Sequence, residues 1–310
     1  MSSTGPQGVR GIGSTTKVLD HGYVKLIGWM GTDETIIESA RMSTGKGFIG
    51  WEPMGKVCKH CGKQEAVCTL GTCLGGGQHE PEEHKGDAKL LEFMWKNGHS
   101  TPFEFCELTV EVQAPIFVFR EWHRHRTQAY SEFSARYSQM PNLHYLPEES
   151  RIQKQGISNR QGSEAEVHPD ALEILRRLEN EQDDVYGHYR ELVEDEGVAK
   201  EIARLNTPVS RYSKMRAKTD LRNWLGFLAL RMAPNAQFEI RQYANAVAEI
   251  VKELWPRTWV LFEEHTLGAV KLSKSEQRVL MADIHTAMSQ NQITLRPESL
   301  SALKKLEAGK

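Results

Sequence analysis

The sequence predicts a mixed α and β fold in which a few strands are accompanied by long helices. Residues 107–113, ELTVEVQ, alternate apolar and polar side chains with the two-residue period of a half-buried strand. After residue 169, helical patterns dominate. Because the strands are few and irregularly placed, a doubly wound parallel sheet is excluded.

The regular elements follow one another along the chain with recognisable boundaries. Asp33 is the expected N-cap of the first helix, and Pro115 opens a helix where its missing N–H costs least. Strands are expected at residues 18–24 (a strand pair), 107–113 and 134–138 (SARYS). Helices are expected at residues 33–43, 88–98, 115–126, 169–196, 198–205, 219–232, 237–255, 275–289 and 297–306.

Two segments lack the periodicity of a packed core. Residues 1–16 are rich in Gly, Ser and Thr, which predicts a mobile leader. Residues 44–87 are dominated by Gly, Lys, Cys, Glu and His without a regular period, which indicates an insertion. The main domain therefore extends over residues 17–270, and residues 271–310 form a helical C-terminal extension.

The length of the chain is compatible with an enzyme, and its net charge argues against a protein that binds polyanions in general. A chain of 310 residues can bury a full core, and its formal net charge of −2 gives no global bias toward nucleic acid. No run approaches the roughly 20 apolar residues of a membrane span, and the N-terminus has no secretion signal. We therefore expect a soluble, cytoplasmic protein with local ligand sites and no membrane or nucleic-acid partner.

Residues 120–138, REWHRHRTQAYSEFSARYS, contain a dense cationic cluster of four arginines and two histidines. Like charges this close together raise the free energy unless an anion is present. A solvated basic helix face is the alternative interpretation. The apolar run PIFVF directly before the cluster favours arginines that emerge from a buried element, and guanidinium forks suit bidentate phosphate binding.

Arg124, His125 and Arg126, then seven residues and Ser134, resemble the RHR-x7-S signature of flavin-dependent thymidylate synthases. Three other segments resemble family elements in the same order: ESARMS the early Arg-x-Ser element, GHSTPFEF the H-x-[TS]-P-F-E segment, and LRMAPNAQFEIRQYA the C-terminal helix. The matches cover about residues 18–43 and 88–270. The resemblance implies a mixed α+β fold with a central, mostly antiparallel sheet and long helices, assembled as a homotetramer with shared active sites.

The resemblance also implies a reaction. The chain would make dTMP from dUMP, with methylene-tetrahydrofolate as carbon donor and FAD, reduced by NADPH, as hydride donor. No GxGxxG follows a predicted strand, so FAD binding cannot depend on a Rossmann turn. The cysteine nucleophile of a classical thymidylate synthase has no counterpart, since Cys106 lies in an apolar segment where burial raises a thiol pKa.

Two other functions remain open at this level. Transfer of hydroxymethyl instead of methyl to dUMP would use the same pocket and flavin. A zinc-ribbon protein that binds nucleic acid through its arginines is the alternative from another class. The near-neutral charge and the lack of aromatic and basic residues interleaved around the cysteines argue against the second.

The resemblance assigns ligand contacts residue by residue. The expected dUMP contacts are Glu121, Arg124, Glu132, Phe133, Ser134, Ala135, Arg136, Lys214 and Arg241. The expected FAD contacts are Ser43, Thr101, Glu104, Arg124, His125, Arg126, Glu132, Arg231 and Asn235. Glu121 stands where the family often has Gln, and Lys214 stands where some relatives have Arg.

Arg241 is the catalytic candidate. By the resemblance its guanidinium is held against the uracil ring, where a cation favours the ionised, electron-rich base and makes C5 more nucleophilic. The alternative is an arginine on the exposed side of an amphipathic helix.

Four of the five cysteines lie close together in the insertion. The spacing Cys58-x2-Cys61-x6-Cys68-x4-Cys73 allows four thiolates around one tetrahedral, structural zinc ion. A reduced, flexible loop, an iron–sulfur centre, and mixed ligation with His60, His79 or His84 are the alternatives.

Overall fold

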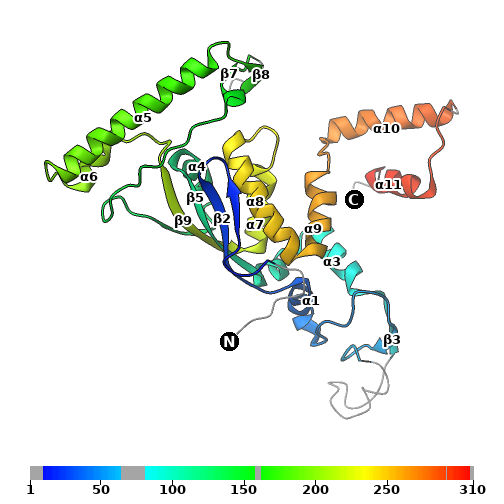
Figure 1. Ribbon diagram of the computed structural model, residues 1–310. Coiled ribbons are helices and arrows are strands. Elements are labelled where there is room, and N and C mark those ends of the chain that lie inside the picture. Colours follow the sequence, from blue (N-terminus) through cyan, green and yellow to red (C-terminus); the bar gives the residue numbers. More distant parts are fainter. Residues whose placement is uncertain (1–9, 64–80, 158–161, 291, 308–310) are drawn as a thin grey trace. The chain divides into compact units, whose positions relative to one another are not determined.

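The computed structural model describes residues 10–63, 81–157, 162–290 and 292–307 (Figure 1). The chain divides into two compact units, Met1–Glu263 and Glu264–Lys310. The larger unit contains the sheet and every site residue expected from the sequence. Of the four metal-ligand candidates, Cys68 and Cys73 lie outside the described residues.

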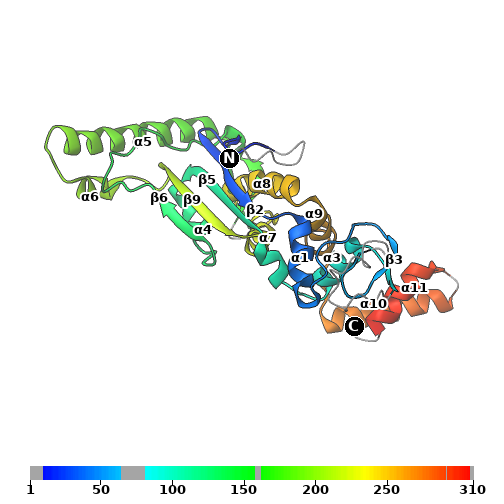
Figure 2. The same cartoon turned by 90° about the horizontal axis from the view of Figure 1, so that it is seen from below.

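The larger unit is built on a five-stranded sheet whose neighbouring strands are all antiparallel. In spatial order the strands are β1 (Thr15–Val18), β2 (Gly22–Met30), β5 (Glu107–Pro115), β9 (Tyr212–Asp220) and β6 (Ala129–Glu132). Figure 2 shows β2, β5 and β9 side by side. The predicted mixed fold with an antiparallel sheet is therefore confirmed.

One face of the sheet is apolar and the other is polar. In β5 the side chains of Leu108, Val110 and Val112 are fully buried, and Thr109 and Glu111 between them are half-buried on the opposite face. β9 repeats this pattern with buried Met215 and Ala217 between exposed basic residues. The alternation in β9 is plain in the sequence KMRAKT, but no strand was expected there.

Two helices cover the apolar face (Figure 1): α7 (Leu221–Arg231) contacts β5 and β9, and α8 (Phe238–Leu254) contacts β1 and β2. The side chain of Asp220 accepts a hydrogen bond from the Asn223 N–H at 2.9 Å, so it caps α7 directly where β9 ends. The buried Trp224 donates its indole N–H to the Leu108 carbonyl at 3.0 Å. The helices expected at 219–232 and 237–255 are thus α7 and α8.

The remaining elements of the larger unit surround this core. The helices are α1 (Asp33–Arg41), η1 (Met42–Thr44), α3 (Asp87–Lys96), η2 (Thr101–Phe105), α4 (Ile116–Trp122), η3 (Glu149–Arg151), α5 (Ala171–Glu194), α6 (Lys200–Ala203), η4 (Arg204–Asn206) and α9 (Pro256–Phe262). Two small two-stranded sheets pair β3 (Gly55–Cys58) with β4 (Pro81–His84), and β7 (Gln153–Gln155) with β8 (Ser163–Val167).

The smaller unit is helical in its described part. The π-helical turn η5 (Glu263–Leu267) starts at the unit boundary, and α10 (Lys274–Ser289) and α11 (Pro297–Glu307) follow. A capping box fixes the start of α10, because the Ser273 hydroxyl accepts from the Glu276 N–H at 3.3 Å and Glu276 accepts from the Ser273 N–H at 2.7 Å. No helix of the described residues is both long and apolar enough to cross a membrane.

Asp33 caps a different helix from the one expected. Thr32 is the N-cap of α1, and the Asp33 side chain is only 4% exposed. Its carboxylate accepts hydrogen bonds from the N–H groups of Arg257 and Thr258 at 2.8 and 3.1 Å, and from the Thr258 hydroxyl at 2.6 Å. These N–H groups belong to the first turn of α9, a helix that local periodicity did not reveal.

Two expectations around the cationic cluster were wrong. The helix α4 ends at Trp122, so Arg124 and Arg126 lie in a turn and not on a helix. The segment 134–138 is a turn, in which the Ser134 carbonyl accepts from the N–H groups of Tyr137 and Ser138 at 3.1 Å each. The strand of this region is β6, which precedes that turn and pairs with β9.

The described ends of the insertion are attached to α1 through Asp87. This carboxylate is fully buried, accepts from the N–H groups of Ile49 and Gly50 at 2.8 and 3.0 Å, and forms an ion pair with Arg41. The His84 ring nitrogen Nε2 lies 3.4 Å from it. Asp87 therefore holds the two sides of the insertion together at its base.

The beginning of the described chain is also attached to the core. Arg10 forms an ion pair with Glu253 of α8 at 2.8 Å, and the Gly13 N–H donates to the Leu26 carbonyl at 2.8 Å. Thr15 and Thr16, which composition placed in the leader, belong to β1.

Candidate active site

The arginines of the RHR motif lie in a turn that the aromatic residues Trp122 and Tyr130 hold in place. The fully buried Trp122 donates its indole N–H to Gln128 at 3.0 Å, and the Tyr130 hydroxyl donates to the His125 carbonyl at 2.7 Å. Arg124 and Arg126 are exposed, and neither guanidinium has a hydrogen-bond or ion-pair partner among the described residues. Both positive charges are therefore available to an anionic ligand.

Arg231, at the end of α7, joins the motif to α4. Its Nε donates to His125 Nε2 at 2.9 Å, its Nη1 to the Glu121 carboxylate at 3.0 Å, and its Nη2 to the Glu121 carbonyl at 2.9 Å. Burial and the charge of Arg231 lower the pKa of His125 to about 4. The imidazole is therefore neutral near pH 7, with its proton on Nδ1, because Nε2 is the acceptor.

Glu121, which replaces the frequent glutamine, is used inside this junction. Burial raises the pKa of the Glu121 carboxyl above its ordinary value, and the positive charge of Arg231 offsets only part of that rise. The carboxylate of Glu121, which stands in place of an amide, is thus paired with the guanidinium of Arg231 at 3.0 Å.

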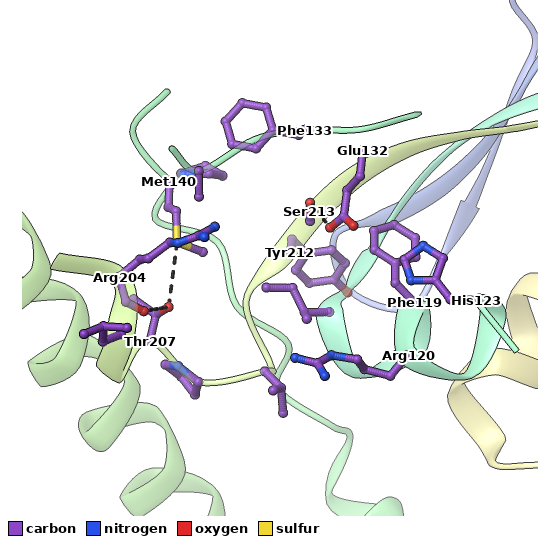
Figure 3. Close-up of a pocket in the computed structure, with 16 residues that line it drawn as sticks. Phe119, Arg120, His123, Glu132, Phe133, Met140, Arg204, Thr207, Tyr212 and Ser213 are labelled. Carbon is purple, nitrogen blue, oxygen red and sulfur yellow. Dashed lines mark hydrogen bonds between the residues drawn. The ribbon is translucent and has the colours of Figure 1, made fainter. Parts of the chain in front are cut away.

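A pocket of about 430 Å³ lies beside the motif (Figure 3). Three of the expected dUMP contacts line it, namely Glu132, Phe133 and Ala135. The Ser213 hydroxyl donates to Glu132 Oε1 at 2.9 Å, which fixes this carboxylate on the pocket wall. We refer to this cavity as the α4 pocket.

A smaller cavity of about 170 Å³ adjoins the α4 pocket and is lined in part by Lys214. The two cavities share Phe133, Pro141, Tyr212 and Ser213. On the same face of β9, Arg216 and Lys218 form ion pairs with glutamates of β5 at 3.4 and 2.6 Å. Lys214 is instead paired in register with Gln113 and has no carboxylate partner in the described part of the chain. Of the three basic residues of this face, Lys214 is therefore the one available to a ligand.

Arg241 and Asn235 line a third and larger cavity of about 1000 Å³. The Arg241 guanidinium donates to the Pro234 carbonyl at 3.0 Å and lies 5.9 Å from the centre of the Phe238 ring. Ile240 and Ala244, on the other side of the helix, are fully buried. We refer to this cavity as the α8 pocket; none of its lining residues also lines the α4 pocket.

The other expected contacts are not lining residues of these three cavities. Ser43 is in η1, and Thr101 and Glu104 are in η2, where Glu104 forms an ion pair with Arg222 at 2.6 Å. The Ser134 hydroxyl accepts from the Arg136 N–H at 3.3 Å, and the Arg136 side chain is paired with Glu201 at 3.0 Å. Within one chain, the residues expected around dUMP and FAD thus do not converge on a single pocket.

The cysteines have two different environments. Cys106 is fully buried, and burial raises the pKa of its thiol to about 12, so it is a poor nucleophile. Cys58 and Cys61 pack against each other across a tight turn at the end of β3. No group of three metal-ligating side chains comes together within the described ranges.

Arg120, Arg204, Tyr212 and Ser213 are among the lining residues of the α4 pocket that were not assigned to a ligand from the sequence. Arg120 was visible as part of the cationic cluster. Tyr212 and Ser213 begin β9, so recognising its alternating pattern would have placed them beside β5 and β6. Arg204 had no local signal.

The fold is a mixed α/β one with an antiparallel sheet, and basic side chains without a carboxylate partner among the described residues line the α4 pocket, which suits an anionic ligand. Residues 25–257 match the sequence model of the family described as "Thymidylate synthase complementing protein". The chain is 40% identical over 267 residues to a flavin-dependent thymidylate synthase of Thermus thermophilus, covering 86% of this chain and 84% of the relative. It is 36% identical over 265 residues to that of Wolbachia pipientis wMel, covering 85% and 81%.

A solved structure gives the same result. The UMP/dUMP methylase PolB from Streptomyces cacaoi, bound with 5-Br dUMP, superposes with a TM-score of 0.62 at 26% identity, covering 81% of this chain and 98% of that one. The chain therefore belongs to the family of flavin-dependent thymidylate synthases. The resemblance stated from the four sequence motifs is confirmed.

Proposed function

We propose that this chain synthesises dTMP by reductive methylation of dUMP, with methylene-tetrahydrofolate as carbon donor and NADPH-reduced FAD as hydride donor. The observation that carries the proposal is the pair of exposed, unpaired guanidinium groups in the RHR turn, next to a pocket lined by three expected dUMP contacts. The relatives named as flavin-dependent thymidylate synthases, and the dUMP methylase bound with a dUMP analogue, support it.

The residues around the RHR turn fit a flavin. Arg124 and Arg126 supply unpaired positive charge for a pyrophosphate, and neutral His125 is held in one orientation by Arg231. Ser43, Thr101, Glu104, Glu132 and Asn235 are proposed as further FAD contacts. When bound, FAD supplies the hydride that completes the methyl group. The protein's part is to bind and orient the reactants.

Arg241 is proposed to act on the uracil ring. Its helix is anchored by buried Ile240 and Ala244, so the guanidinium is presented at the α8 pocket. The Pro234 carbonyl that holds it at 3.0 Å is a neutral acceptor, which a more negative ligand can replace. There the charge would favour the ionised, electron-rich form of the base, which makes C5 more nucleophilic toward the carbon donor.

We expect Arg241 of a second copy to join the other proposed nucleotide contacts in one site. These contacts are Glu121, Arg124, Glu132, Phe133, Ser134, Ala135, Arg136 and Lys214. The α4 and α8 pockets have no lining residue in common, which supports a site completed between chains. We therefore propose a homotetramer with shared active sites.

A structural zinc ion held by Cys58, Cys61, Cys68 and Cys73 is also proposed. The turn that carries the first two is tight: the Gly62 N–H donates to the Cys58 carbonyl at 2.8 Å, the Cys58 N–H donates to the Lys63 carbonyl at 2.8 Å, and Gly62 adopts a φ of 72°. Two mutually packed cysteines at this spacing are half of a tetrahedral site. Thiolate ligands need a reducing compartment, which agrees with a cytoplasmic location and no membrane partner.

The reaction is tested with the purified, FAD-containing protein. In anaerobic stopped-flow experiments, dUMP should accelerate the oxidation of NADPH and the reduction of the flavin. Mass spectrometry of the nucleotide product distinguishes methyl from hydroxymethyl transfer. Absence of any dUMP-dependent flavin reduction would refute the proposal, and a colourless protein that binds zinc and shifts DNA would support the nucleic-acid-binding alternative.

Arg241→Ala tests the catalytic assignment. We expect dTMP formation to fall about 100-fold or more while FAD stays bound and reducible, because the stabilisation is present mainly in the transition state. Arg190→Ala, on the exposed side of α5, is the matched control and should retain activity. Near-normal turnover of Arg241→Ala would refute the catalytic role, and loss of flavin would place Arg241 in the cofactor site.

Two further measurements test the assembly and the metal. Mixed oligomers of Arg241→Ala and Lys214→Ala should recover activity if each site uses two chains, whereas a site within one chain gives none. Elemental analysis should find zinc in the wild type and lose it in Cys58→Ser/Cys61→Ser, which should be less stable. A metal-free wild type would remove the zinc proposal.

A further inference from the structure

The α4 pocket contains two arginines on opposite walls. Arg120 comes from the last turn of α4, and Arg204 comes from the start of η4, on the far side of the cavity (Figure 3). Neither belongs to the motif positions assigned to dUMP or FAD. Throughout the described ranges, neither guanidinium has a hydrogen-bond or ion-pair partner.

The charge of the pocket is not balanced by its lining. Glu132 is the single acidic residue among the lining side chains, against two arginines. One of its carboxylate oxygens already accepts the Ser213 hydroxyl at 2.9 Å. Two positive charges facing one cavity repel each other, and an anion placed between them removes that cost.

Both arginines are carried by well-anchored backbone. On α4, Val118, Phe119 and Trp122 are buried in the core, which leaves Arg120 on the pocket side of the helix. At η4, the Arg204 carbonyl accepts from the Thr207 N–H at 3.1 Å and from the Thr207 hydroxyl at 2.7 Å. The distance between the two attachment points is therefore set by the fold, as a preorganised binding pair requires.

The remaining lining is mainly apolar. Phe119 and Met140 are almost fully buried, and Ile116, Pro141 and Val209 are among the other apolar lining residues. A free inorganic ion would leave these walls in contact with water. The lining is suited to a ligand with an apolar or aromatic body and a negatively charged end.

We infer that Arg120 and Arg204 together bind an oxyanion of one of the two substrates, as a subsite of the proposed reaction. Two groups have this chemistry: the phosphate of the nucleotide and the glutamate carboxylates of the folate. Arg136, the other arginine near the pocket, is occupied by Glu201 at 3.0 Å. The inference rests on the proposed function. It adds to that function a pair of substrate-binding arginines, one from α4 and one from η4.

The experiment compares wild type, Arg120→Ala, Arg204→Ala and the double variant, each loaded with FAD, and uses Arg190→Ala as the control. Calorimetry measures the Kd for dUMP and deoxyuridine, and for methylene-tetrahydrofolate and its pteroate analogue without glutamate. Loss of two charge-assisted hydrogen-bond donors should weaken binding of one substrate about 10- to 100-fold. The analogue that lacks the anionic group, deoxyuridine or the pteroate, should bind wild type and every variant with the same Kd.

A selective loss for dUMP over deoxyuridine assigns the subsite to the phosphate, and a selective loss for the folate over the pteroate assigns it to the carboxylates. KM should rise accordingly, while kcat and flavin content change less than about twofold.

Arg120→Lys/Arg204→Lys keeps the charge and should recover part of the affinity even if the alanine variants are unstable. Unchanged Kd values for both substrates in the double alanine variant would overturn the inference. Because binding is measured directly, failure of the proposed reaction would appear separately, as wild-type protein without dUMP-dependent flavin reduction.

Discussion

Replacement of Arg231 by alanine is expected to destabilise the folded protein by about 2 kcal/mol. The variant loses three hydrogen bonds from one cationic donor, two to Glu121 and one to His125. Breaking a fully buried ion pair costs about 3–5 kcal/mol. Here the side chains of Arg231 and Glu121 are 19% and 28% exposed, so solvent screening makes the cost of breaking the ion pair smaller.

A double-mutant cycle with Glu121→Gln separates the ion pair from the rest of the junction. Glutamine keeps an acceptor for Arg231 but removes the negative charge. We expect Glu121→Gln to cost less than Arg231→Ala, and the coupling energy between the two positions to be about 1 kcal/mol. Urea unfolding of FAD-free protein gives the free energies without a contribution from ligand binding.

The matched control is Arg190→Ala. Arg190 forms an exposed ion pair with Glu194 at 3.5 Å on α5, where both side chains are about half exposed. Its loss should change the free energy of unfolding by less than about 0.5 kcal/mol. If Arg231→Ala is no more destabilising than this control, the three hydrogen bonds of Arg231 do not stabilise the fold.

Three further predictions use buried or half-buried groups. Asp33→Ala should cost about 3 kcal/mol in urea unfolding, since it removes three hydrogen bonds to the start of α9; a loss below about 1 kcal/mol would contradict the capping role. The Cys106 thiol, with its pKa raised to about 12, should react with Ellman's reagent at pH 8 only after unfolding, so rapid labelling of native Cys106 would disprove its burial. The lowered pKa of His125, about 4 against an ordinary 6.5, means that the unfolded chain binds this proton more readily; the stability carried by neutral His125 is complete above about pH 6.5 and is lost as the pH falls toward 4. Urea midpoints between pH 7 and 4.5 should therefore fall more steeply for wild type than for His125→Gln, and equal slopes would refute the assignment.

Local patterns in the sequence were sufficient for the long helices, for the strand pair of β1 and β2, and for β5. α5, α8 and β5 each carry a repeating apolar face, and the family motifs identified the RHR turn. β9 was missed although its alternation is clear, because its basic outward residues were not read as a strand. The start of α9 was missed for another reason: the carboxylate that caps it, Asp33, lies 225 positions before Thr258.

The sequence by itself determined the family, the reaction class and the residue types at the proposed site, because motifs of fixed spacing are local and can be read in one dimension. Only the tertiary structure decided which of those residues meet. Arg231 and His125 are 106 positions apart, and no local pattern indicates that one donates to the other. Likewise, Arg120 and Arg204 face one pocket, whereas Arg241 faces another. Such contacts arise when the sheet and its helices pack through their apolar faces, because this packing also fixes where the charged side chains lie. The local sequence around a charged residue does not show which residue it will contact.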